Sequence, residues 1–177
     1  MLKKLLLSII ILAPVVAIGQ TSNNTGIPIP MKDNKVWYEK SYTLTNTKKA
    51  NLYSNGLKWF KAAFPYPGKN IELTNEQAGE IKGTGIFKIV INNTGAYYWI
   101  RLKVTIDVTD SGYSVKATDF YEKPIKKGIS NEYSKIEYRW WDFRQGKPWS
   151  AEDQGLFIGL DSTATSMMAS LQKVMAK

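Results

Sequence analysis

The sequence predicts an α+β domain in which an antiparallel sheet of about five strands carries two helices packed on one face. Residues 97–109 alternate strictly, with an apolar side chain at every even position, which is typical of a strand with one buried face. Two segments with apolar residues at helical spacing flank a run of strand-like segments. Such a sheet leaves its second face to solvent, to a covering loop or to a binding function.

The first strand is expected at residues 35–43, which are rich in aromatic residues and partly alternate. A helix follows over residues 48–64, with Asn46 or Thr47 as its N-cap. Gly56 lies within the apolar stripe of this helix, where a glycine costs about 1 kcal/mol relative to alanine. We therefore expect close packing between the Gly56 region and a strand that contains three glycines: Gly79, Gly83 and Gly85.

The remaining strands are expected at residues 70–73, 79–91, 97–109 and 113–121. A tight Asp-Ser-Gly turn joins the last two. The aromatic-rich segment 122–150 has weak periodicity, and within it residues 138–143 form either a short extra strand or an ordered loop. A second helix is expected from Asp161 or Ser162 to about Met175, with an apolar face that packs on the sheet.

Residues 1–19 are predicted to be a secretory signal peptide. Two lysines precede the apolar run 5–18, and Ala17 and Gly19 are spaced like the −3 and −1 positions of a cleavage site. The apolar run spans about 21 Å as a helix, which is too short for a hydrocarbon core of about 30 Å. An uncleaved anchor is the alternative; after cleavage, no transmembrane segment is expected.

Cleavage after Gly19 leaves a polar leader at residues 20–34, which we expect to be flexible, and a single domain at residues 35–177. Loss of two lysines lowers the formal charge from +9 to +7. Lysine greatly outnumbers arginine, which favours a solubilising charge shell, with attraction to an acidic partner as the alternative. We expect the mature chain in the periplasm or outside the cell.

The absence of cysteine and histidine excludes disulfides and every nucleophile, base or metal ligand of those two residue types. No calcium-loop pattern is present, and we expect no metal or cofactor. A glycan-processing hydrolase would need two carboxylates placed across a cleft. Asp119 is the single carboxylate that stands out most as a candidate for such chemistry. We favour a structural role for it, in which it accepts backbone hydrogen bonds where its strand ends.

Aromatic and basic residues give the strongest functional hint. The odd positions of the strand 97–109 place Tyr97, Trp99, Arg101 and Lys103 on the second face of the sheet. The segment 122–150 adds six candidate partner-binding residues: Tyr138, Arg139, Trp140, Trp141, Arg144 and Trp149. Rings interleaved with arginine suit the binding of sugars, peptides or single-stranded nucleic acid. Alternatively, the tryptophans of the segment 122–150 fold over the second face and protect Trp99.

An ordered set of segments covers about residues 35–125: Val36-Trp-Tyr-Glu39, Lys49-Ala-Asn-Leu-Tyr-Ser-Asn-Gly-Leu-Lys-Trp-Phe60, Glu80-Ile-Lys-Gly-Thr-Gly85, the strand leading to Gly112-Tyr113, and Ala117-Thr-Asp-Phe-Tyr121. As a set they resemble a family of secreted Gram-negative bacterial proteins, the domain of unknown function with a TATA-binding-protein-like fold. The resemblance implies a fold and a compartment. It implies no activity, so no functional residue is carried over.

These observations predict a secreted, non-enzymatic binding or interaction module of the bacterial cell envelope, whose partner is an envelope protein or glycan. The compartment and the modest charge disfavour nucleic acid. The alternatives are a glycan-processing hydrolase that uses Asp/Glu pairs and a structural envelope protein with no small ligand. The oligomeric state and the identity of the partner are left open by the sequence.

Overall fold

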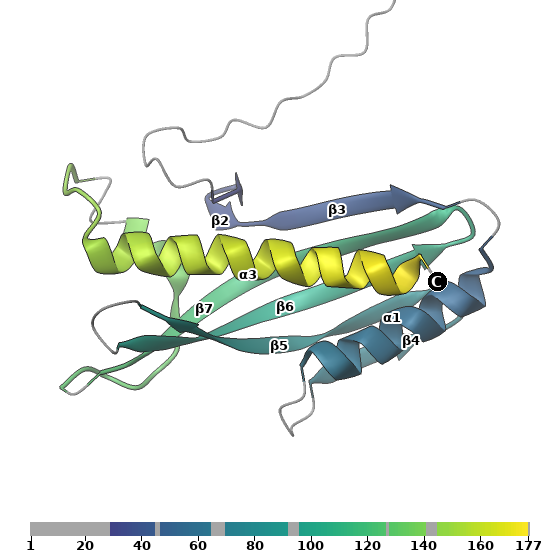
Figure 1. Ribbon diagram of the computed structural model, residues 1–177, viewed down its shortest axis with the longest axis horizontal. Helices are drawn as coiled ribbons and strands as arrows, with labels where there is room; N and C mark the ends of the chain where they lie inside the picture. The colour runs from purple at the N-terminus through teal and green to yellow at the C-terminus, as the bar shows by residue number, and fades with distance from the viewer. Residues whose placement is uncertain are drawn as a thin grey trace, which may run out of the picture.

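The computed structural model describes residues 29–44, 47–64, 70–91, 96–126, 128–140 and 145–176 (Figure 1). Its strands are β1 (Met31–Lys32), β2 (Lys35–Val36), β3 (Tyr38–Thr43), β4 (Ile71–Asn75), β5 (Glu80–Val90), β6 (Tyr97–Thr109), β7 (Gly112–Ile125) and β8 (Ser134–Lys135). Its helices are α1 (Lys49–Ala63), the 3₁₀ helix η1 (Ile136–Tyr138) and α3 (Ala151–Met175). The predicted signal peptide, residues 1–19, lies outside the described residues.

Among the described residues, the main sheet has six strands and is antiparallel throughout. Five of them follow the order β3-β7-β6-β5-β4, and β8 pairs with β7 beyond the end of β3. The centre of the sheet is the β6–β7 pair, which runs the full length of both strands. The predicted α+β class is confirmed, with one strand more than the five expected.

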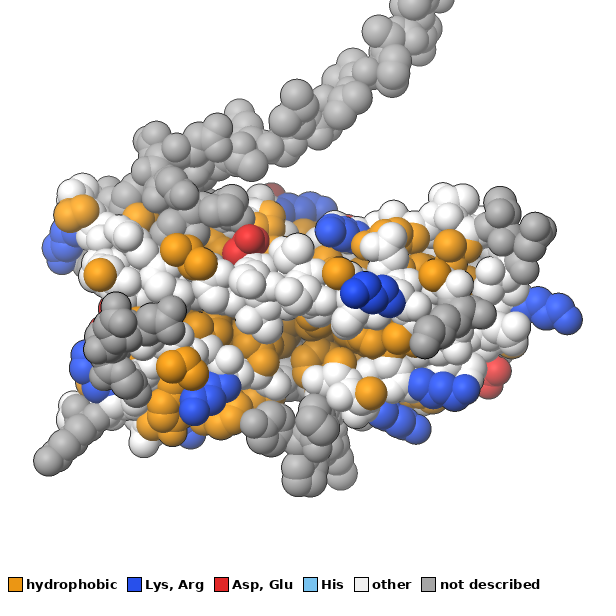
Figure 2. Space-filling model, in the orientation of Figure 1, with side chains coloured by type: hydrophobic (Ala, Val, Ile, Leu, Met, Phe, Trp, Pro, Cys, Tyr) orange, Lys and Arg blue, Asp and Glu red, His pale blue; other side chains and the backbone are white. Residues whose placement is uncertain are grey.

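The two α-helices, α1 and α3, lie on the same face of the sheet, as Figure 1 shows and as the sequence predicts. The side chains of β6 that point toward them are almost completely buried, among them Ile100, Val104 and Ile106. Viewed from this side, hydrophobic side chains fill the band between α3 and the strands below it (Figure 2). Burial of these side chains is the main force that holds the helices on this face.

The glycines of β5 admit aromatic rings from α1. A Cβ atom on Gly83 would lie 2.7 Å from the ring of Phe60, and one on Gly85 would lie 2.5 Å from the ring of Phe64. Gly56 does not face these glycines; it packs against side chains of β5, β6 and α3. The expected close approach of α1 to β5 therefore exists. Gly56 contacts Ile81 of β5, whereas Gly83 and Gly85 face the rings of Phe60 and Phe64, which occupy the space where side chains on these glycines would lie.

Helix α3 begins well before the predicted start at Asp161. Its N-cap is Ser150, whose hydroxyl oxygen accepts the N–H of Asp153 at 3.0 Å, while the Asp153 carboxylate accepts the N–H of Ser150 at 3.2 Å. This reciprocal capping box is readable in the sequence as Ser-x-x-Asp. Two glycines, Gly155 and Gly159, lower the helix propensity of the first turns of α3. For this reason the sequence pattern did not reveal that the helix begins so early. The two glycines let α3 closely approach Ile89 of β5 and Ile91, the residue after that strand.

Two expectations near the N-terminus need correction. The N-cap of α1 is Lys48, with no side-chain cap hydrogen bond, in place of Thr47 or Asn46; the latter lies outside the described residues. The end of the predicted flexible leader is a hairpin, because β1 pairs with β2 around a turn at Asp33 and Asn34. Both turn residues have positive φ, which aspartate and asparagine tolerate better than other non-glycine residues.

A β-bulge interrupts β7 at Asp119, which has a φ of +50°. The extra residue reverses the alternation of the strand, so that Phe120 and Glu122 point to the helices while Tyr121 and Lys123 point away. Asp119 therefore lies within a strand that continues to Ile125, and its side chain is exposed. The prediction that this carboxylate ends its strand was wrong.

Candidate functional site

Four predicted site residues lie together on the side of the sheet that faces away from α1 and α3, which we call the open face. Tyr97, Trp99 and Arg101 are half-buried there, and Lys103 is exposed. Their orientation follows from the buried residues between them on β6. One of these, Tyr98, points to the helices and donates its hydroxyl to Glu152 of α3.

Rings and cations gather at one end of the open face, in a group that we call the ring–cation cluster: Tyr97, Trp99, Arg101, Tyr121, Tyr133, Lys88 and Lys123. Its members are cross-strand neighbours on β5, β6 and β7, apart from Tyr133, which comes from the segment before β8. The Lys88 ammonium lies 3.9 Å from the centroid of the Tyr97 ring. The rings of Tyr97 and Trp99 are nearly perpendicular, with centroids 6.4 Å apart.

Arg101 is held by two tyrosine rings. Its guanidinium carbon lies 4.8 Å from the ring centroid of Tyr121 and 4.4 Å from that of Tyr133. Lys123 lies near the same Tyr133 ring, at 5.8 Å. Stacking on rings restrains the planar guanidinium while leaving N–H groups at its edge for a planar anion such as a carboxylate.

The two ends of the open face differ in charge. At the end away from the ring–cation cluster, lysines meet carboxylates: Lys82 pairs with Glu80, and Lys116 lies 3.4 Å from Asp107 and 3.8 Å from Glu39. Within the described part of the chain, the cations of the other end have no ion-pair partner: Lys88, Arg101, Lys103 and Lys123. The net positive charge of the face is thus concentrated beside the rings.

A cleft of about 440 Å³ opens between these two ends. Its wall includes the cations Arg101 and Lys103, together with Tyr121 and Thr84. The Thr84 hydroxyl donates to the Glu72 carboxylate at 2.6 Å. Asp119 also borders the cleft, where the bulge directs its exposed side chain. The volume falls within the usual range of small-ligand sites, about 300–1,000 Å³.

A smaller cavity of about 210 Å³ lies on the other side of the bulge and brings three carboxylates to its wall: Asp33, Asp119 and Glu137. One of the three is engaged in structure, because Glu137 accepts the backbone N–H of Val36 at 2.9 Å. Across the residues that the structure describes, no group of three acidic side chains is arranged to hold a metal ion.

Trp140 and Trp149 do not cover the open face as the alternative interpretation expected. Trp140 is buried, Trp149 is half-buried, and both pack on Phe157 of α3, with ring centroids 4.5 Å and 4.8 Å away. They extend the core under the N-terminal turns of α3 and are not candidates for partner binding. Tyr138 is 66% exposed. Trp141 and Arg144 lie outside the described residues.

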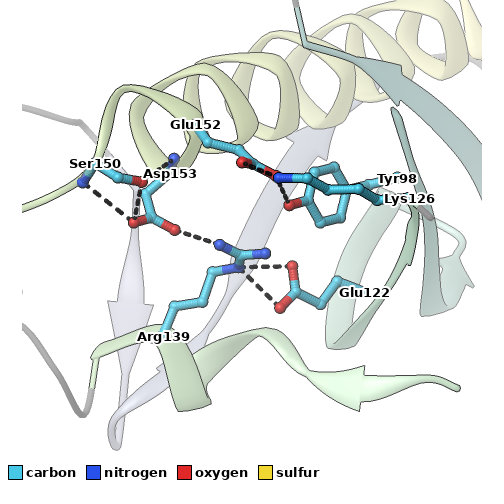
Figure 3. A network of polar contacts seen from close by, with 7 residues as sticks. All are labelled: Tyr98, Glu122, Lys126, Arg139, Ser150, Glu152 and Asp153. Atoms are coloured by element: carbon cyan, nitrogen blue, oxygen red, sulfur yellow. Dashed lines mark hydrogen bonds and ion pairs between the residues drawn. The ribbon is translucent and has the colours of Figure 1, made fainter. Parts of the chain in front are cut away.

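Arg139, a predicted binding residue, is part of an internal ion-pair network (Figure 3). Its guanidinium bonds both carboxylate oxygens of Glu122, at 2.8 and 2.7 Å, and also bonds Asp153 in the first turn of α3. It lies 5.1 Å from the ring centroid of Tyr98. The prediction for Arg139 was wrong because the chain turns toward the helix side after β8.

Burial controls the electrostatics of this network. Glu122 is only 6% exposed, and burial raises the pKa of its carboxyl group, although the Arg139 guanidinium opposes that rise. The pKa of Arg139 itself is raised: burial acts against this, but Glu122 and Asp153 outweigh it. The hydrogen bond from Tyr98 lowers the pKa of Glu152. The network therefore fastens β7, η1 and the start of α3 to one another.

Sequence reasoning missed four members of the ring–cation cluster: Lys88, Tyr121, Lys123 and Tyr133. Lys88 was readable, because it lies on the polar side of an alternating strand. Tyr121 and Lys123 were hidden by the bulge, which reverses the alternation beyond Asp119. The position of Tyr133 depends on the fold of the segment after β7, for which the sequence has no periodic signal.

Two solved structures have similar folds. A TBP-like protein from Parabacteroides distasonis ATCC 8503 matches with a TM-score of 0.69 at 18% identity, over 84% of this chain and 97% of that one. A DUF4468 family protein from Bacteroides ovatus ATCC 8483 matches with a TM-score of 0.68 at 16% identity, over 84% of this chain and 91% of that one. No curated protein matches the chain.

A family model described as "Domain of unknown function (DUF4468) with TBP-like fold" matches residues 38–123. That segment runs from β3 into β7 and contains the β5 and β6 residues of the ring–cation cluster. The segment after β7, with Tyr133, Arg139 and α3, lies beyond the match. The resemblance drawn from the sequence is therefore confirmed over residues 38–123, which match the family of domains of unknown function with a TBP-like fold.

Proposed function

We propose that this chain is a secreted, non-enzymatic binding module of the bacterial cell envelope that holds an anionic partner on its open face. The observation that carries the proposal is Arg101, which is stacked on Tyr121 and Tyr133 and has no ion-pair partner within the described residues. An arginine kept only for solubility would be expected to extend into water. Its restraint by two rings lowers the entropy that it loses when an anion binds.

The residues around Arg101 favour a partner in which the anionic group is part of a larger molecule. Lys103 adds a second positive charge to the same cleft. Tyr97 and Trp99 continue the surface with rings on which a sugar or an apolar group of a partner stacks. Carboxylate-bearing glycans and acidic protein segments are the two partner classes that this chemistry accommodates.

The test compares two substitutions on the same face. Arg101→Lys keeps the charge but removes the planar fork, whereas Lys116→Ala removes a charge that Glu39 and Asp107 already neutralise. The probes are an oligomer of galacturonic acid, a neutral galactose oligomer of equal length and a polyglutamate peptide, titrated by calorimetry at low and moderate salt.

We expect at least one acidic probe to bind and the neutral oligomer not to bind. Arg101→Lys should weaken that binding about tenfold or more, as expected for loss of a charge-assisted bidentate contact. Lys116→Ala should change it less than twofold. Weakening by Lys116→Ala without weakening by the charge-conserving Arg101→Lys would reduce the effect to general charge, and absence of binding to both acidic probes would overturn the proposal.

A further inference from the structure

The outer edge of β5 is longer than the strand that covers it. β4 pairs with β5 only at Glu80–Gly83, whereas β6 pairs with β5 along its whole length. Along the outer side of residues 86–90, the described part of the chain places no strand. Figure 1 shows β5 continuing along the border of the sheet beyond β4.

The backbone of this edge presents hydrogen-bonding groups in a regular row. The Thr84 N–H donates outward, to the Asn70 carbonyl oxygen at 2.7 Å, whereas the Ile91 N–H donates to the side of β6, to the Ala96 carbonyl oxygen at 2.9 Å. Because the direction alternates along an antiparallel strand, the N–H and C=O groups of the even residues point away from the sheet. Three such residues lie beyond β4: Ile86, Lys88 and Val90.

The side chains of the edge leave this row accessible. Natural edge strands are commonly protected by a charged side chain, especially lysine, which discourages pairing with another strand. Here the Lys88 ammonium is drawn inward over the ring of Tyr97, at 3.9 Å. Val90 is 57% exposed on the open face, and Phe87 is half-buried on the opposite face. The edge therefore combines main-chain groups that no described strand pairs with apolar side chains on both faces.

We propose that residues 86–90 bind an extended segment of a partner protein as an added β-strand. The partner residue opposite Lys88 shares the open face with it, next to unpaired cations, and is acidic. The residues on either side of that acidic residue point to the other face, beside Phe87 and Ile89, and are apolar. The bound segment thus reads apolar–acidic–apolar, and its main chain supplies affinity as in other strand-addition complexes.

A second copy of this chain fits the edge less well. When two copies pair these residues in antiparallel fashion, Lys88 of one copy lies either directly opposite Lys88 of the other or at the neighbouring diagonal position on the same face. Like charges at cross-strand positions are destabilising, and no described carboxylate forms an ion pair with Lys88. An acidic partner segment removes this repulsion, which is why it is the preferred occupant.

The experiment uses a soluble peptide with the central sequence Val-Glu-Val flanked by threonines, and a second peptide with lysine in place of glutamate. Binding is followed by amide hydrogen exchange of the whole protein. We expect the glutamate peptide to slow exchange at Ile86, Lys88 and Val90 at least tenfold and the lysine peptide to have a weaker effect. The same glutamate peptide with methylated backbone nitrogens on its pairing side should have none.

Two variants make the test specific. Lys88→Pro deletes an outward N–H without removing a hydrogen bond to β6, so it should abolish peptide binding; Lys88→Thr keeps the N–H and should retain binding but lose the preference for glutamate. Arg101→Lys should leave binding of this peptide unchanged, which separates the edge from the proposed open-face function.

Unchanged exchange at the three edge residues with the glutamate peptide would overturn the inference. Binding of the N-methylated peptide equal to that of its parent would also overturn it, and this readout does not depend on the proline variant folding. If the unsubstituted protein sediments as a dimer and Lys88→Pro abolishes that dimer, the edge is assigned to self-association instead.

Discussion

Replacement of Arg139 by methionine tests whether this residue is structural, as its contacts indicate, or partner-binding, as the sequence suggested. Methionine keeps most of the side-chain volume but leaves Glu122, 6% exposed, without the Nε–H donor that its two carboxylate oxygens share, and it removes a contact to Asp153. Breaking a buried ion pair costs about 3–5 kcal/mol. Because the Arg139 and Asp153 side chains are 21% and 19% exposed, we expect the lower limit, about 3 kcal/mol.

Urea unfolding at pH 7 measures this cost. With an m-value of about 2 kcal/mol per molar, typical of a domain of this size, the midpoint should fall by about 1.5 M. The double variant Arg139→Met with Glu122→Leu removes the uncompensated charge and should recover most of the loss. Binding of the acidic probe at a urea-free, fully folded condition should be unchanged in both variants.

The pH dependence provides an independent check. Burial raises the pKa of Glu122 in the folded protein. Ionisation of Glu122 therefore destabilises the fold above that pKa, and this destabilisation disappears below the pKa that Glu122 has in the unfolded chain. Without Arg139 the pKa rises further, so the destabilisation of Arg139→Met should shrink as the pH falls from 7 toward 5. A cost below 1 kcal/mol at pH 7, or loss of probe binding with an unchanged midpoint, would refute the structural role.

Two further outcomes are expected. Burial raises the pKa of both Tyr98 and Tyr113 to about 12, so their contribution to stability should be complete below pH 10 and lost as the pH rises toward 12; urea midpoints measured across this range should fall, and less steeply in Tyr98→Phe. At the bulge, Asp119→Val should cost about 1–3 kcal/mol, because a β-branched residue resists a φ of +50°, whereas Asp119→Gly should stay within about 1 kcal/mol of the parent by the same measurement. Equal effects of the two substitutions would show that the backbone conformation at Asp119 does not limit stability.

The sequence was sufficient to predict which residues of β6 face the helices. Its even positions are apolar without exception, and a strand has a period of two residues, so one buried face fixes the direction of every side chain. This local rule placed Tyr97, Trp99, Arg101 and Lys103 on the open face. It also predicted the α+β class, because the helical and strand-like segments are separately readable.

The same rule failed where one residue was added to a strand. The bulge at Asp119 shifts the register of β7 against β6, so counting by two assigns Tyr121 and Lys123 to the wrong face. An aspartate within a strand is compatible with a bulge, because it tolerates positive φ, but it does not fix one. The bulge is stable because the pairing and burial on both sides of it are retained, and those contacts come from strands elsewhere in the chain.

What the sequence determined by itself is the side of the sheet that each regular strand residue faces, because that depends only on local period and hydrophobicity. The tertiary structure alone decided the path of the chain after β7. It turned Arg139 and Trp140 inward to Glu122 and Phe157, and brought Tyr133 to Arg101. These pairings depend on the energy of contacts between distant segments, which no local pattern records.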